Sequence, residues 1–308
     1  MTADRFGAVP TGEYTALASV RDSMSGRSIP AQRPEEPPTA GPPAPAPAAP
    51  GRPRSAEPAW RPVIPPQHGA WAFLIVPVLC AFAVAGASPA GWLFLAAWVC
   101  AYPVGYYLGR GLTARARRGS WTRLARRERT RAIPWAVLTA ALGLPLVVTR
   151  PWLLVAAGIL AVLWGIGLVI AARQGERSMA NDLMLVAQAA VALPLAVAVV
   201  LGPASLSGEL AGSVLEATVI VAAYLAGSVL HVKSLLREAG NVRFRQANVA
   251  WHGVLAVGAA VVSPWWLLAF LPALARAILL RPGMRPGAIG GVEAVISVLV
   301  VIAALLAL

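Results

Sequence analysis

Three histidines are the first candidates for chemistry in this sequence of 308 residues. His68 stands in PPQHGAW, directly before a long apolar run, while His231 lies at the end of another run and His252 near the start of a third. Imidazole changes its charge close to neutral pH, and an ionisable side chain beside an apolar segment is a functional candidate. We therefore expect the three histidines to face a polar pocket.

Other polar side chains recur at helical spacing near the ends of apolar runs. Tyr102, Tyr106 and Arg110 follow each other four residues apart, as do Lys233, the only lysine, and Arg237. Such spacing places side chains on one face of a helix. The predicted pocket consists of His68, Tyr102, Tyr106, Arg110, Asn181, Asp182, His231, Lys233, Arg237, Glu238, Asn241 and His252.

Cations and hydrogen-bond donors predominate in this set. They favour an anion next to lipid, such as a phosphate or carboxylate headgroup with an apolar tail. Two histidines from facing helices could instead ligate a haem or a transition metal, and imidazole could also be the acid or base of an enzyme acting on a lipid-like substrate. The sequence contains no HExxH, GxSxG or GxxxxGK[ST] motif, so the catalytic residues and the cofactor stay unknown, and no metal site is predicted.

Each candidate also has a structural interpretation. Asn181 and Asp182 are typical of the first turn of a helix, where they cap backbone N–H groups. Lys233 and Arg237 could be anchors at the level of the lipid headgroups, and the tyrosines could belong to an aromatic belt.

The composition indicates the kind of structure that holds these residues in place. Hydrophobic residues make up 58% of the chain and charged residues 13%, and mean hydropathy is +0.67. A soluble domain would carry about 25% charged residues, so we predict an all-α polytopic membrane protein. The nine expected spans are 69–87, 90–108, 132–149, 152–172, 181–201, 214–233, 246–262, 265–281 and 289–308.

Basic residues are distributed very unevenly between the predicted connections. With the N-terminus in the cytoplasm, the outside connections 88–89, 150–151, 202–213 and 263–264 contain one basic residue, Arg150, and the other 25 lie in the inside regions. The positive-inside rule then predicts an N-terminus inside and a C-terminus outside. The net charge of +13 is thus explained by orientation rather than by nucleic acid, and the loop at 110–131 is a candidate contact for anionic lipid. The opposite half offers only Glu209, Glu216, Glu293 and some serines.

Residues 1–64 form a Pro/Ala-rich segment that cannot bury enough apolar surface to offset its ordering entropy. We expect a disordered cytoplasmic tail there and a membrane domain at 65–308. A transporter is the least supported function, because no acidic residue is identified at the bilayer centre and no matched pair of broken helices is evident.

The strings PPQHGAWAFLIVP, YYLGR and HVKSLLREAGNVRF resemble the YwiC-like family of bacterial membrane proteins. The resemblance extends over about residues 65–308 and implies a multi-pass protein of the bacterial inner (plasma) membrane, without assigning an activity.

The nine-span architecture, with long connections after spans two and six, is similar to that of the UbiA-type intramembrane prenyltransferases. In that family, Asp-rich motifs at these two places hold Mg²⁺ and a prenyl diphosphate. Here Tyr102, Tyr106 and Arg110, and then Lys233 and Arg237, keep the four-residue spacing but reverse the charge. Cations cannot hold Mg²⁺, so the likeness implies a shared scaffold without Mg²⁺-dependent prenyl transfer.

Overall fold

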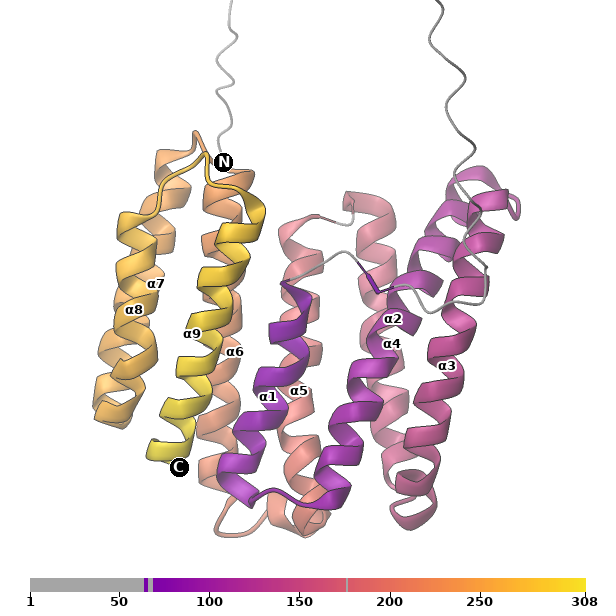
Figure 1. The fold of residues 1–308 in the computed structure, drawn as a ribbon, viewed down its shortest axis with the longest axis horizontal. Helices are drawn as coiled ribbons and strands as arrows, with labels where there is room; N and C mark the ends of the chain where they lie inside the picture. Colours follow the sequence, from indigo (N-terminus) through magenta and orange to yellow (C-terminus); the bar gives the residue numbers. More distant parts are fainter. Residues whose placement is uncertain (1–63, 66–68, 176) are drawn as a thin grey trace, which may run out of the picture. The chain divides into compact units, whose positions relative to one another are not determined.

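The computed structural model describes residues 64–65, 69–175 and 177–308. The predicted tail, except Ile64, and the candidate His68 lie outside the described residues. In the described part of the chain all regular structure is helical (Figure 1). The α-helices are α1 (Ala70–Ala85), α2 (Pro89–Arg118), α3 (Arg123–Thr149), α4 (Leu153–Gln174), α5 (Met179–Leu201), α6 (Ala211–Leu236), α7 (Val242–Val262), α8 (Leu267–Leu279) and α9 (Pro286–Ala307), with short 3₁₀ helices at Pro203–Leu206 and Pro264–Trp266.

Capping residues mark where several helices begin. Ser88, Thr122 and Ser178 each accept a hydrogen bond from the backbone N–H three residues later, which satisfies one of the four unpaired donors of a helix N-terminus. The cap of α5 is therefore Ser178, and the structural interpretation of Asn181 and Asp182 as caps is wrong. These two residues do lie in the first turn of α5, as the sequence predicts.

Consecutive helices run in alternate directions. The connections after α2, α4, α6 and α8 lie at one end of the bundle, and those after α1, α3, α5 and α7 lie at the other (Figure 1). The first end carries the arginine-rich sequence and is called the arginine-bearing end below. The nine predicted helical segments are confirmed, and the orientation of the bundle in a membrane stays a prediction.

Six of the helices described, α2 to α6 and α9, are long and apolar enough to cross a membrane. The apolar stretches Ala70–Ala85 and Pro264–Leu279 are shorter, and α7 begins with a polar segment that includes Arg243 and Arg245. The described part of the chain is thus all-helical, and the protein is a multi-pass membrane protein.

The predicted loop at 110–131 is a helical hairpin, which corrects the sequence interpretation. α2 continues to Arg118, α3 starts at Arg123, and a four-residue turn containing Gly119 at φ 65° joins them. The two helices approach closely at Gly111, where a Cβ would lie 3.2 Å from the Ala125 carbonyl oxygen. We call residues 110–131 the arginine hairpin.

Small side chains form the centre of the bundle. α1 packs against α2, α5, α6 and α9, and α5 packs against α1, α2, α4 and α6. On α5, Ala189, Ala192 and Ala196 are buried, and Ala81 of α1 is buried with them. Without a hydrophobic driving force between helices in lipid, such small residues allow the close contact on which packing depends.

Candidate functional site

The residues of the predicted pocket lie at separate places in the structure. Tyr102, Tyr106, Arg110 and Asn181 line a cavity between α2, α3, α4 and α5. Lys233, Arg237 and Asp182 join the end of α6 to the start of α5. Glu238 and Asn241 form the turn before α7, and His231 and His252 lie in a polar cluster on α6 to α9.

The cavity has a volume of about 550 Å³ and follows much of the length of α2 and α4. On α2 its lining extends from Phe94 to Thr113, and on α4 from Leu153 to Ala171. At a rise of 1.5 Å per residue, each of these segments is about 27–29 Å long, close to the thickness of a bilayer core. We call this space the α2–α5 cavity.

Polarity changes along the α2–α5 cavity. Away from the arginine-bearing end its walls are apolar, with Phe94, Leu146 and Leu153. Towards the arginine-bearing end they include Arg110 and Asn181. The cavity is therefore long and amphipathic.

Aromatic contacts order the polar end of the cavity. The ring centroid of Tyr102 is 5.8 Å from that of Trp71 and 6.2 Å from that of Tyr106. Arg110 Nη1 donates to Tyr106 Oη at 2.8 Å, and the guanidinium lies over the Tyr106 ring. The predicted stripe on α2 is thus one connected unit.

Lys233 has internal partners next to the cavity. Its Nζ lies 2.7 Å from Asp182 Oδ2 and also donates to the Arg177 carbonyl oxygen at 2.7 Å. Arg237 Nη1 donates to the same carbonyl at 2.9 Å. Asp182 is adjacent to the cavity-lining Asn181, so these contacts fix the wall of the cavity from α6.

The turn between α6 and α7 uses the two remaining predicted residues. Asn241 Nδ2 donates to Glu238 Oε2 at 2.9 Å, and Asn241 Oδ1 accepts from the Phe244 backbone N–H at 3.1 Å. Asn241 is exposed and caps α7. These contacts shape the turn.

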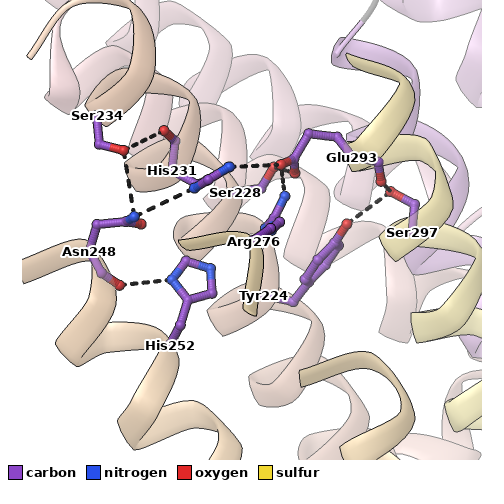
Figure 2. Close-up of polar contacts among 9 residues, drawn as sticks. All are labelled: Tyr224, Ser228, His231, Ser234, Asn248, His252, Arg276, Glu293 and Ser297. Atoms are coloured by element: carbon purple, nitrogen blue, oxygen red, sulfur yellow. Dashed lines mark hydrogen bonds and ion pairs between the residues drawn. The ribbon is translucent and has the colours of Figure 1, made fainter. Parts of the chain in front are cut away.

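His231 and His252 belong to a buried cluster that includes unpredicted residues (Figure 2). Arg276 of α8 and Glu293 of α9 form an ion pair, and Ser228 of α6 donates to Glu293 Oε2. His231 Nε2 lies 4.0 Å from Glu293 Oε1. We call the nine residues drawn in Figure 2 the buried polar cluster; they are Tyr224, Ser228, His231, Ser234, Asn248, His252, Arg276, Glu293 and Ser297.

Two sequence interpretations are corrected here. Glu293 was placed in the opposite half, but α9 starts at the arginine-bearing end, and Glu293 is only about 10 Å along it at 1.5 Å per residue. Arg276 was counted as an inside charge, yet its side chain is only 3% exposed and pairs with Glu293. Two opposite charges inside neighbouring apolar spans were the signal that could have found the pair, because unpaired charges are costly there.

The described residues contain no group of three or more His, Cys, Asp and Glu side chains placed to hold a metal ion. The ring centroids of His231 and His252 are 6.3 Å apart and nearly perpendicular.

Comparison with known proteins gives one match. The sequence model of the YwiC-like protein family matches residues 64–197. This part of the chain is similar to the YwiC-like family. The match covers α1 to α4 and most of α5, and hence every residue that lines the α2–α5 cavity, whereas the buried polar cluster lies beyond it.

No curated protein and no solved structure matches the chain. The architectural likeness to UbiA-type prenyltransferases therefore stays a prediction.

Proposed function

We propose that this YwiC-like membrane protein binds an anionic amphiphile in the α2–α5 cavity. The observation that carries the proposal is the gradient along the cavity, from Phe94 and Leu153 at one end to Arg110 and Asn181 at the other. An apolar tail would occupy the first region, and a phosphate or carboxylate headgroup would lie at the second. A volume of about 550 Å³ is in the usual range for a small-molecule site.

Arg110 is the proposed headgroup ligand. A guanidinium offers five N–H donors in a planar fork that matches phosphate and carboxylate oxygens. Its bond to Tyr106 orients that fork at the polar end of the cavity. Asn181 lines the same polar end of the cavity from α5.

Lys233 and Arg237 have a positioning role in this proposal. Their contacts with Asp182 and Arg177 hold the start of α5, and so Asn181, against the cavity. A direct contact of either cation with the headgroup is the alternative that the sequence predicts.

The arginine hairpin supports a second contact with lipid. Arg115 and Arg129 lie over the Trp121 ring, and most of its other arginines are exposed. Near an anionic membrane surface each basic residue contributes about 1 kcal/mol. We infer that the hairpin rests on anionic headgroups at the cytoplasmic face of a bacterial plasma membrane.

Native mass spectrometry of the full chain in mild detergent tests the proposal. We expect a retained amphiphilic anion, and dodecyl phosphate should bind where uncharged dodecanol does not. Arg110→Gln should weaken binding of dodecyl phosphate about 10-fold or more, because a hydrogen bond to a charged group contributes about 1.5–3 kcal/mol.

Arg127→Gln is the matched control, since Arg127 is exposed in the arginine hairpin and does not line the cavity. Equal binding by the wild type and Arg110→Gln would overturn the assignment of Arg110. A chain that takes up neither compound would overturn the function.

A further inference from the structure

The buried polar cluster lies outside the α2–α5 cavity, and none of its residues lines that cavity. No residue in it is more than 8% exposed, although it contains two charged side chains and two imidazoles. Ionisable groups at membrane depth are costly and are retained mainly where they function. Several of its polar atoms have no hydrogen-bond partner among the described residues, including His252 Nε2 and Asn248 Oδ1. Such atoms require an explanation.

The contact with Asn248 favours one tautomer of His231. The amide nitrogen of Asn248 lies 3.5 Å from His231 Nδ1, and an amide nitrogen can only donate. Nδ1 of His231 therefore accepts, and in the neutral ring the hydrogen is on Nε2. That N–H is directed at Glu293, whose Oε1 is 4.0 Å away (Figure 2).

His252 has the opposite tautomer. Its Nδ1 lies 2.8 Å from the backbone carbonyl oxygen of Asn248, which can only accept, so Nδ1 carries the hydrogen. Nε2 of His252 is then an unprotonated nitrogen with a lone pair. It is buried and has no partner among the residues described.

Glu293 is less suited to take up a proton. Its carboxylate pairs with Arg276, accepts a hydrogen bond from Ser228 and faces the Nε2–H of His231. All three neighbours stabilise the charged form. His231 Nδ1, the other unprotonated ring nitrogen, already has the Asn248 amide as its partner, so the basic atom of the cluster without a partner among the described residues is His252 Nε2.

The space around His252 restricts the ligand. A Cβ built on Gly227 would lie 3.1 Å from His252 Nε2, so the backbone of α6 lies directly against this nitrogen. A headgroup or other bulky molecule does not fit there, whereas a proton needs no cavity.

We propose that His252 is the proton acceptor of an intramembrane proton-binding site on α6 to α9. A proton from the aqueous phase forms an N–H bond at Nε2, while Nδ1–H stays bonded to the Asn248 carbonyl. The charge of the cluster changes from zero to +1, and release returns the same proton. The site is independent of the amphiphile cavity.

Ionisable groups from four helices surround this reaction. Arg276 of α8 and Glu293 of α9 form the neutral pair beside it, and His231 lies on α6. Tyr224 of α6 forms a hydrogen bond with Ser297 of α9, and Cys80 of α1 is buried in the same packed core as Tyr224. Lys233 lies two residues after His231 on α6, and its charge is balanced by Asp182.

Solid-state NMR of the full chain in lipid bilayers, labelled with ¹⁵N-histidine, tests the proposal directly. The chain has only three histidines, and His68→Gln and His231→Asn assign their signals. At high pH we expect a hydrogen on Nε2 of His231 and on Nδ1 of His252. As the pH falls, Nε2 of His252 should become protonated before His231 gains a second hydrogen.

A hydrogen on His252 Nε2 at high pH would overturn the proposal. So would a neutral His252 at every pH at which the protein stays folded. Both readouts come from the wild-type histidines and do not depend on a variant of the ion pair.

Arg276→Gln gives a second test. It removes a positive charge and leaves Glu293 negative, so the midpoint of His252 protonation should move to higher pH. Arg127→Gln, in the arginine hairpin, should leave it unchanged. An unchanged midpoint in Arg276→Gln would show that the cluster does not act as one site.

Discussion

Three basic side chains show how much residue environment differs within one end of the molecule. Arg110 is exposed at the polar end of a cavity, Lys233 is buried and paired with Asp182, and Arg276 is buried and paired with Glu293. A cation buried in a membrane protein needs an opposite charge beside it. Lys233 and Arg276 each have a carboxylate partner, so the chemical role of a basic residue here depends on its partner as well as on its type.

Sequence reasoning singled out Arg110 and Lys233 but not Arg276, and it could not find the partner of Lys233. Spacing predicted the stripe Tyr102, Tyr106 and Arg110, because neighbours on one helix are set by its period. It could not predict that Lys233 meets Asp182, because that contact depends on how α6 packs on α5. For the same reason the sequence could not show that His231 and His252 lie apart from the residues that line the cavity.

Replacement of Lys233 by Met should destabilise the protein without emptying the cavity. Asp182 and the Arg177 carbonyl would each lose a charged hydrogen bond, at a cost of about 1–3 kcal/mol. The thermal midpoint in mild detergent should therefore fall, while dodecyl phosphate still binds to the folded fraction. Arg237→Met, which removes an exposed contact with the same carbonyl, should change the midpoint much less. Loss of dodecyl phosphate binding at an unchanged midpoint would instead make Lys233 a ligand residue.

At the scale of elements, apolar run length predicted the helices well and their ends less well. The spans expected near 90–108 and 132–149 are parts of longer helices that end and begin in the arginine hairpin. Hydropathy reports only the part of a helix that lies in lipid, whereas arginine is a good helix former and continues α2 and α3 into water.

Hydropathy also cannot predict where two helices pack closely. The contact of α6 with α7 at Gly227 is an example that can be tested. On α6 this glycine faces His252 and Trp251 of α7, and a Cβ would lie 3.1 Å from both side chains. Gly227→Leu should force the two helices apart and lower the free energy of unfolding by about 1–3 kcal/mol. Gly158→Leu is the control, because a Cβ at Gly158 of α4 would meet nothing within 4 Å. A similar thermal midpoint for both variants in mild detergent would contradict the packing at Gly227.

At the scale of the whole membrane domain, the two sites occupy different groups of helices. The α2–α5 cavity is lined by residues of α1 to α5, in the part of the chain that matches the YwiC-like family model, and the buried polar cluster lies on α6 to α9. α1 and α5 pack against helices of both groups, and the Lys233–Asp182 pair joins α5 to α6 near the arginine-bearing end. These packing contacts and this ion pair therefore connect the two groups of helices.

Charge asymmetry makes the membrane orientation testable. The arginine-bearing end contains the turn at Ser120, and the other end contains the connection at Ser207; both serines are exposed. By the positive-inside rule Ser120 faces the cytoplasm and Ser207 the outside. In a chain with Cys80 and Cys100 replaced by Ala, we expect Ser207→Cys to react with a membrane-impermeant maleimide in intact bacterial spheroplasts. Ser120→Cys should react only after permeabilisation. The reverse pattern would place the C-terminus inside, and labelling of both positions from outside would mean that an odd number of helices between them does not cross the membrane.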